Sequence, residues 1–304
     1  MFPLVISAVA CINVASRSSL NVMDRFLFSR SKMGFFQLYF LTNIFPLVLG
    51  LLILPLCEVK VGFWECFWTW PCVLLALTAH LVGMSFSYAF RQCQVGQVVI
   101  KAKLPELIFA SLSLIPFISN QFPLFSSDRK TYCVLVTTLL GLMLLGLQKK
   151  GKIASLFDRP GVYIIGSLVL QMLCCSLVPS STPKALGEVF TLSVAMLLWR
   201  CCFVVPQLAA FTSYKVAQGV VVAEGLTAGT VGLLSCRAAV ALLTQLTFTW
   251  CVLEGSPLLI WPIINSTPLI SSLASQLILK EVPHWSEVGA LVCFFLGSIC
   301  ATFL

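Results

Sequence analysis

The sequence predicts an all-α membrane protein with ten transmembrane helices, arranged as two inverted repeats of five helices. The first observation is composition, because 59% of the residues are hydrophobic and 10% are charged, whereas soluble domains carry about 25% charged residues. The second is the length of the apolar runs, since a span needs about 20 apolar residues and satisfies its own backbone as a helix. The third is a proline-interrupted apolar run in each half of the chain.

The apolar runs define the spans in order along the chain. The N-terminus has no basic region before its apolar run, so we expect a retained first span and not a cleaved signal peptide. The stretch 214–231 is glycine-rich and carries Lys215 and Glu224, which favours a loop or an interfacial segment; an extra span there is the alternative. The ten predicted spans are residues 2–22, 35–56, 70–90, 95–117, 132–148, 161–178, 187–210, 232–253, 256–279 and 286–304.

The cysteines and histidines do not form a metal or disulfide pattern. Most of the 14 cysteines lie inside apolar runs, there is no CxxC motif, and the chain has only 2 histidines. Zinc sites and disulfide frameworks require closely spaced ligands or paired cysteines. We therefore expect no metal and no cofactor, and we interpret the cysteines as small hydrophobic residues.

The distribution of basic residues predicts the orientation in the membrane. Lysine and arginine gather in the loops after odd-numbered spans, which the positive-inside rule places in the cytoplasm, with both termini outside. The net charge of +8 is thus a topology signal, and the expected partners are membrane lipids and a small molecule, not nucleic acid. The residues assigned to these loops are Arg25, Arg30, Lys32, Arg91, Lys149, Lys150, Lys152, Arg159, Lys215, Arg237 and Lys280.

A polar, basic linker at 148–161 divides the chain into a first repeat (1–150) and a second repeat (151–304). The fourth span reads IKAKLPELIFASLSLI around Pro105, and the ninth reads IINSTPLISSLASQLI around Pro268. Five spans per half is an odd number, so the second half must be inverted. Inverted repeats with interrupted helices at equivalent positions are typical of secondary transporters.

The C-terminal half resembles the EamA-like group of the drug/metabolite transporter superfamily. The resemblance lies in 246–297, which has a span, a short break, a helix with internal Pro268, Glu281 at its end and a glycine-containing last helix. It implies ten spans in a five-plus-five arrangement. It also implies that the ninth helix lines the cavity, where Trp261 would stack on the substrate and Asn265 would bind it by hydrogen bonds.

The segment GQVVIKAKLPE (96–106) resembles the fourth-span motif of the triose-phosphate and nucleotide-sugar branch of that superfamily. The resemblance implies that Lys101 faces the central cavity and pairs with an anionic group of the substrate. The second basic pair of that branch is absent, because residues 264–267 read INST. A carboxylate or a zwitterion therefore fits better than a doubly charged phosphate.

Ionisable residues within the spans are the other candidates, because a charge at membrane depth is costly and often functional. Arg17, with Asn13 one turn earlier, makes the first span a candidate cavity wall, and Arg200 lies midway along the seventh span. The alternatives are snorkelling to the headgroups for Lys101 and Arg17, and a structural ion pair for Arg200.

Supporting roles fall to residues around the two prolines. Lys103 and Glu106 are spaced to pair with one another, and Pro105 and Pro268 would bend or gate their helices. Tyr88 in the third span is a candidate stacking partner for an aromatic or apolar part of the substrate.

The expected function is secondary active transport or exchange of a small polar metabolite by alternating access. An amino acid, or an amino-acid-like nucleoside such as S-adenosylmethionine, is the expected substrate, and a multi-pass location in a bacterial inner membrane is expected, as a monomer or homodimer. The alternatives are a nucleotide-sugar or organophosphate antiporter, a lipid flippase and a non-transporting membrane protein. No P-loop, HExxH or GxSxG motif is present, so we expect neither ATP-driven transport nor an enzyme.

Overall fold

The computed structural model describes nine segments of the chain, and these segments contain helices and no strand. The described residues are 2–31, 33–57, 62–113, 129–146, 154–177, 186–217, 227–253, 267–281 and 284–303. The helices are α1 (Phe2–Arg30), α2 (Phe35–Ile53), the 3₁₀ helix η1 (Leu54–Leu56), α3 (Phe63–Phe67), α4 (Trp70–Gln92), α5 (Val95–Lys101), α6 (Leu104–Ser113), α8 (Arg129–Gly146), the 3₁₀ helix η3 (Ala154–Phe157), α9 (Arg159–Leu177), α10 (Leu186–Ala217), α11 (Ala228–Leu253), α13 (Thr267–Leu279) and α14 (Trp285–Phe303).

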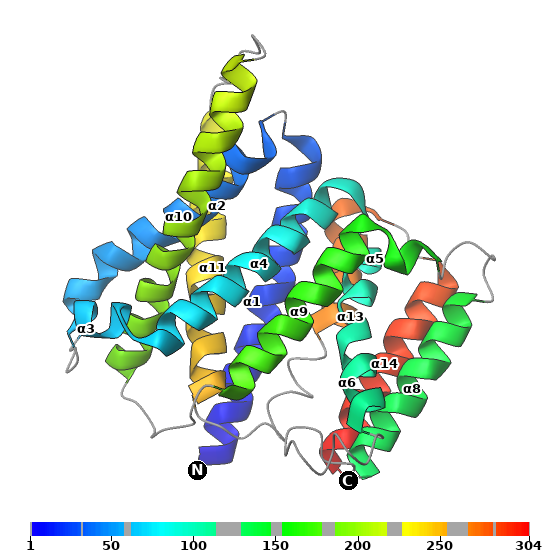
Figure 1. The fold of residues 1–304 in the computed structure, drawn as a ribbon. Coiled ribbons are helices and arrows are strands. Elements are labelled where there is room, and N and C mark those ends of the chain that lie inside the picture. Colours follow the sequence, from blue (N-terminus) through cyan, green and yellow to red (C-terminus); the bar gives the residue numbers. More distant parts are fainter. Residues whose placement is uncertain are drawn as a thin grey trace.

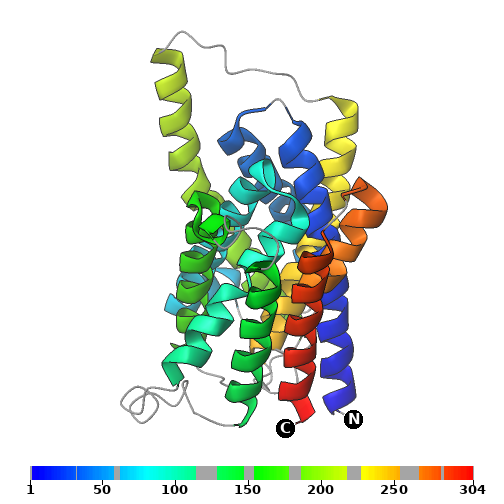
Figure 2. The same ribbon diagram turned by 90° about the vertical axis from the view of Figure 1, so that its right-hand side faces the viewer.

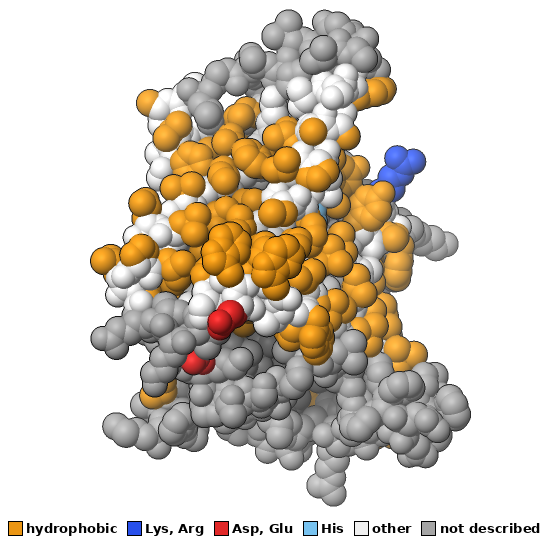
Figure 3. All heavy atoms as spheres, turned by 60° about the vertical axis from the view of Figure 1, so that its left-hand side comes forward, with side chains coloured by type: hydrophobic (Ala, Val, Ile, Leu, Met, Phe, Trp, Pro, Cys, Tyr) orange, Lys and Arg blue, Asp and Glu red, His pale blue; other side chains and the backbone are white. Residues whose placement is uncertain are grey.

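The composition and surface of these helices identify an all-α membrane protein. Large apolar side chains are exposed along them, such as Leu52 with 70% and Leu277 with 84% of its surface exposed. Figure 3 shows hydrophobic side chains spread over one broad face of the molecule. Within the described ranges, four helical segments are long and apolar enough to cross a bilayer, and they are Phe35–Leu56, Trp70–Gln92, Gly187–Tyr214 and Ala228–Cys251.

The helices form one bundle with both chain termini at the same end (Figures 1 and 2). Within it, α1 packs against α11 and α13, α4 packs against α9 and α10, and α2 packs against α10 and α11. The α8 and α14 helices lie side by side in both views (Figures 1 and 2). Each predicted span overlaps at least one of these helices.

Two helices correct the sequence-based predictions. The first helix was predicted to end at residue 22 but runs to Arg30, so Asp24 and Arg25 lie within it. Arg237 was assigned to a loop but lies inside α11. The stretch 214–231, predicted as a loop with an extra span as the alternative, has its two ends in α10 and α11, and its middle part, 218–226, lies outside the described residues.

The described part of the predicted fourth span forms two helices, where a single helix bent at Pro105 was expected. The α5 helix ends at Lys101, and α6 begins at Leu104 with Pro105 in its first turn, where the missing N–H costs nothing. Pro268 occupies the same position in α13, directly after its first residue, Thr267.

Glycines bring α8 and α14 into close contact. A Cβ atom built on Gly141 of α8 would lie 2.5 Å from the ring of Phe294, and one built on Gly297 of α14 would overlap Thr137. Small residues at such interfaces let helix backbones approach closely within a membrane.

Gly297→Leu is therefore expected to push α14 away from α8 and to lower stability by about 1–3 kcal/mol, the usual cost of overpacking. Thermal unfolding of the purified protein in detergent measures this as a lower Tm. Gly166→Leu is the control, because a Cβ at Gly166 has no atom within 4 Å. Equal Tm values for the two variants would show that this contact does not need glycine.

Candidate functional site

A cavity of about 130 Å³ lies among six helices near the middle of the bundle. Its lining residues come from α1, α2, α4, α9, α10 and α11. Arg17 of α1 and Arg200 of α10 both line it, and each lies about 20 Å or more from either end of its helix at 1.5 Å per residue. Snorkelling to the headgroups does not explain side chains at that depth, so these two arginines define the candidate site.

The Arg17 guanidinium faces an aromatic ring. Its Cζ atom lies 6.0 Å from the centroid of the Phe248 ring on α11, within the range of a weak cation–π contact. Among the residues that the structure describes, no hydrogen bond or ion pair of Arg17 is found. Within this part of the chain, Arg17 is therefore available to an anionic ligand.

Asn13, one turn before Arg17, joins α1 to α11 by hydrogen bonds. Its amide Nδ2 donates to the Thr244 carbonyl at 3.0 Å and to Thr247 Oγ1 at 2.9 Å. Thr244 lines the cavity, so Asn13 lies directly behind the wall, and it was predicted as a binding residue. Asn13 therefore joins α1 to α11 and is not among the residues that line the cavity.

Arg200 lies in a niche that depends on a glycine. A Cβ atom built on Gly83 would lie 2.9 Å from Arg200 Nη2 and 3.0 Å from the Tyr39 hydroxyl. The Tyr39 hydroxyl itself donates to the His80 carbonyl at 2.9 Å. The Nε atom of Arg200 has no acceptor and no carboxylate pairs with Arg200 among the described residues. Within the described part of the chain, the second cavity arginine therefore also has no acidic partner.

A buried ion pair between Asp24 of α1 and Arg237 of α11 forms another part of the cavity wall. Each residue is 7% exposed. The guanidinium donates from Nε to Asp24 Oδ1 and from Nη2 to Asp24 Oδ2, the second at 3.0 Å. The remaining Nη1 donates to the Thr42 carbonyl of α2 at 2.8 Å. Sequence reasoning missed this pair, although Arg237 lies within the predicted span 232–253, which is the signal that could have found it.

The rest of the cavity wall is neutral, partly polar and partly aromatic. Asn21 donates from Nδ2 to Ser271 Oγ at 3.0 Å, and the Gln245 amide donates to Thr249 Oγ1 at 3.2 Å. Phe86, Phe90 and Phe248 supply aromatic surface. Such a wall suits a small solute that has an anionic group and an apolar part.

Lys101 does not line this cavity, in contrast to the role implied by the family resemblance. It is 3% exposed, and its ammonium lies 2.9 and 2.8 Å from the two carboxylate oxygens of Asp158. Asp158 also accepts a hydrogen bond from the Gly161 backbone N–H at 2.8 Å and so caps α9. Lys101 thus joins α5 to α9.

The other predicted site residues are not brought to the cavity. Tyr88 packs its ring against Phe35 at 6.1 Å and Tyr163 at 5.9 Å. Lys103 and Pro105 are buried near the α5–α6 break. The side chains of Glu106 and Pro268, together with Trp261 and Asn265, lie outside the described residues.

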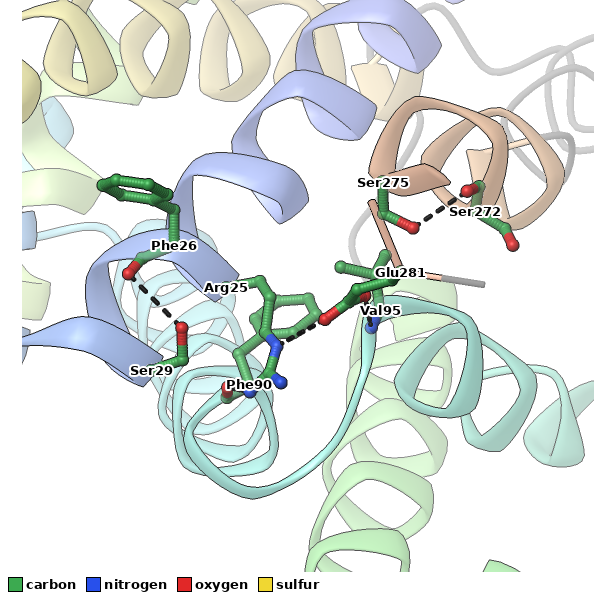
Figure 4. A network of polar contacts seen from close by, with 8 residues as sticks. All are labelled: Arg25, Phe26, Ser29, Phe90, Val95, Ser272, Ser275 and Glu281. Atoms are coloured by element: carbon green, nitrogen blue, oxygen red, sulfur yellow. Dashed lines mark hydrogen bonds and ion pairs between the residues drawn. The ribbon is translucent and has the colours of Figure 1, made fainter. Parts of the chain in front are cut away.

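A polar network that sequence reasoning did not predict lies beside the cavity residue Phe90 (Figure 4). Arg25 donates from Nε to Glu281 Oε1 at 2.8 Å and from Nη1 to the Phe90 carbonyl at 2.7 Å. Glu281 Oε2 accepts the Val95 N–H at 3.0 Å, which caps α5. The network of Arg25, Glu281, Phe90 and Val95 therefore ties α1, α4, α5 and the end of α13 together, and Phe90 connects it to the cavity wall.

Glu281 reaches this position because of a left-handed residue before it. Lys280 has φ 55°, a conformation that ends helices and that non-glycine residues adopt at a cost. The turn reverses the chain after Leu279 and directs Glu281 toward α1 and α5.

The comparisons with known proteins support the fold and no particular activity. No protein-family model and no curated protein matches the chain. Among solved structures, one described only as "Crystal structure of protein" superposes with a TM-score of 0.61. The match covers 98% of this chain and 96% of that chain at 13% sequence identity, so the whole helical arrangement is similar to a known fold.

Proposed function

We propose that the protein is a secondary transporter or exchanger that carries a small polar metabolite with an anionic group across a membrane. The observation that carries this proposal is the mid-depth cavity, which holds Arg17 and Arg200 without acidic partners among the described residues. Charged groups at such depth are retained where they serve a pathway or a ligand. The chain has no nucleotide-binding P-loop motif, so a gradient or a counter-substrate supplies the driving force.

Two inverted repeats, 1–150 and 151–304 with five spans each, would provide the alternating-access mechanism. In that proposal α1, α2 and α4 are equivalent to α9, α10 and α11, and these are the six helices that line the cavity. If each helix is replaced by its equivalent in the other repeat, the α1–α11 contact becomes the α9–α4 contact, which is also present. The α2–α10 and α8–α14 contacts stay the same under this replacement. Rocking of the two repeats about the cavity would expose it to one side and then to the other.

The cavity also bears on the substrates that the EamA-like resemblance suggests. An amino acid would bind through its carboxylate. S-adenosylmethionine carries a sulfonium cation as well as an ammonium group, and it suits a wall with an excess of arginine less well. The proposed location is a bacterial inner membrane, with the network of Arg25, Glu281, Phe90 and Val95 on the cytoplasmic side.

Uptake into proteoliposomes tests the proposal. Purified protein is reconstituted and offered a panel of labelled amino acids and other organic acids, with and without the same solute inside. We expect accumulation or exchange of at least one anionic solute, and a loss of at least about tenfold in Arg17→Gln and Arg200→Gln, as expected for one charged contact.

The matched control for these variants is Arg91→Gln. Arg91 is exposed at the C-terminal end of α4 and does not line the cavity, so its variant keeps wild-type uptake. If no solute of the panel is transported, or if uptake is unchanged in both cavity variants, the proposal fails.

A further inference from the structure

We propose that the cavity is built for a small dianion, whose two anionic groups are held apart by a short apolar spacer and bind Arg17 and Arg200 separately. The inference rests on the proposed function, since it assigns a substrate class to the same cavity. It follows from a count of charges, from the positions of the two guanidinium groups and from the size of the space.

The charges on the cavity wall do not cancel. Arg17, Arg200 and Arg237 line it together with a single acid, Asp24, which gives a formal excess of two positive charges. Uncompensated charge inside a membrane is costly, so the favoured ligand is the one that brings two negative charges. A monoanion leaves one guanidinium uncompensated, and a zwitterion or a cation adds positive charge.

Asp24 is not free to neutralise Arg17 or Arg200. Its carboxylate is held by two arms of the Arg237 guanidinium, and Arg237 is fixed in turn by the Thr42 carbonyl. Glu281 and Asp158 are engaged with Arg25 and Lys101, and neither lines the cavity. Within the described part of the chain, the compensating charge must therefore come from the ligand.

The two available guanidinium groups lie on different walls. Arg17 projects toward Phe248 of α11, whereas Arg200 lies against Gly83 of α4 and Tyr39 of α2. Two separate anionic groups fit this arrangement better than one group held by both arginines. The aromatic surface of Phe86, Phe90 and Phe248 suits an apolar spacer between them.

The space limits the ligand to a small molecule. The cavity volume is about 130 Å³, below the range of about 300–1,000 Å³ typical of pockets for drug-sized ligands. A four-carbon dicarboxylate is therefore a suitable probe.

Four linear compounds with the same four-carbon length separate charge from size. They are succinate, butyrate, 4-aminobutyrate and putrescine, which at neutral pH are a dianion, a monoanion, a zwitterion and a dication. Titration of each compound into the purified full-length protein by calorimetry would measure its affinity. The shift in Tm that each compound causes would provide a second measure of binding. Succinate is expected to bind at least about tenfold more tightly than butyrate, with 4-aminobutyrate weaker and putrescine without effect.

Arg17→Gln and Arg200→Gln are each expected to reduce succinate affinity to that of butyrate, and Arg91→Gln leaves the preference unchanged. Equal binding of succinate and butyrate, or no binding of succinate, overturns the inference. Uptake measured on the same preparation keeps the two proposals distinguishable. Succinate binding without any transport would contradict the transporter proposal alone. Transport with a preference for monoanions or zwitterions would contradict the dianion proposal alone.

Discussion

Asp24→Asn is expected to destabilise the protein by about 3–5 kcal/mol, because it leaves the Arg237 guanidinium buried without a counter-charge. Asp24 and Arg237 are each 7% exposed, and their ion pair joins α1 to α11. Arg237 also donates a hydrogen bond to the Thr42 carbonyl of α2. Losing the carboxylate therefore loosens three cavity helices at once. Thermal unfolding in detergent measures the effect as a large fall in Tm.

Two further variants separate the buried pair from a general loss of acidic charge. Glu65→Gln removes an exposed carboxylate on α3 and is expected to leave Tm unchanged. The double variant Asp24→Leu with Arg237→Met removes both charges, and it is expected to recover most of the lost stability, since apolar pairs often replace buried ion pairs without cost. A wild-type Tm for Asp24→Asn would show that the pair is not needed for the fold.

The helices were predictable because the length of an apolar run is a local property. The break at Lys101–Leu104 was predictable for the same reason, since Pro105 alone marks it. The end of α1 was missed because Asp24 and Arg25 read as loop charges when their partners are unseen. Those partners, Arg237 and Glu281, lie 213 and 256 positions away in the sequence.

The same physical reason explains which site residues were predicted. Arg17 and Arg200 stand out by their depth in long apolar helices, and depth is visible in the sequence. Lys101 has a similar signature, yet its charge is compensated by Asp158 from the polar linker, 57 positions away. The position of a charged residue deep inside a long apolar run identifies a charge that is costly in a membrane. The fold then determines whether a carboxylate compensates that charge.

Glu281→Gln is expected to loosen the contacts by which the Arg25 network joins α1, α4 and α5 beside the cavity. Glu281 accepts one charged hydrogen bond from Arg25 and one backbone hydrogen bond from Val95 at the start of α5. A neutral amide keeps the size of the side chain but weakens both contacts, and charged hydrogen bonds are worth about 1.5–3 kcal/mol each. Hydrogen exchange of peptides covering residues 91–101 is expected to accelerate at least about tenfold, the factor for each 1.4 kcal/mol.

Asp158→Asn provides a matched comparison for this prediction. Asp158 also pairs with one cation and caps one helix, but it acts on Lys101 and on the start of α9. Its variant is expected to accelerate exchange at the start of α9 and to leave the end of α13 as in the wild type. Because Phe90 accepts a hydrogen bond from Arg25 and also lines the cavity, Glu281→Gln is also expected to loosen the cavity wall at Phe90. Wild-type hydrogen exchange across residues 91–101 in Glu281→Gln would mean that other contacts hold the start of α5 in place.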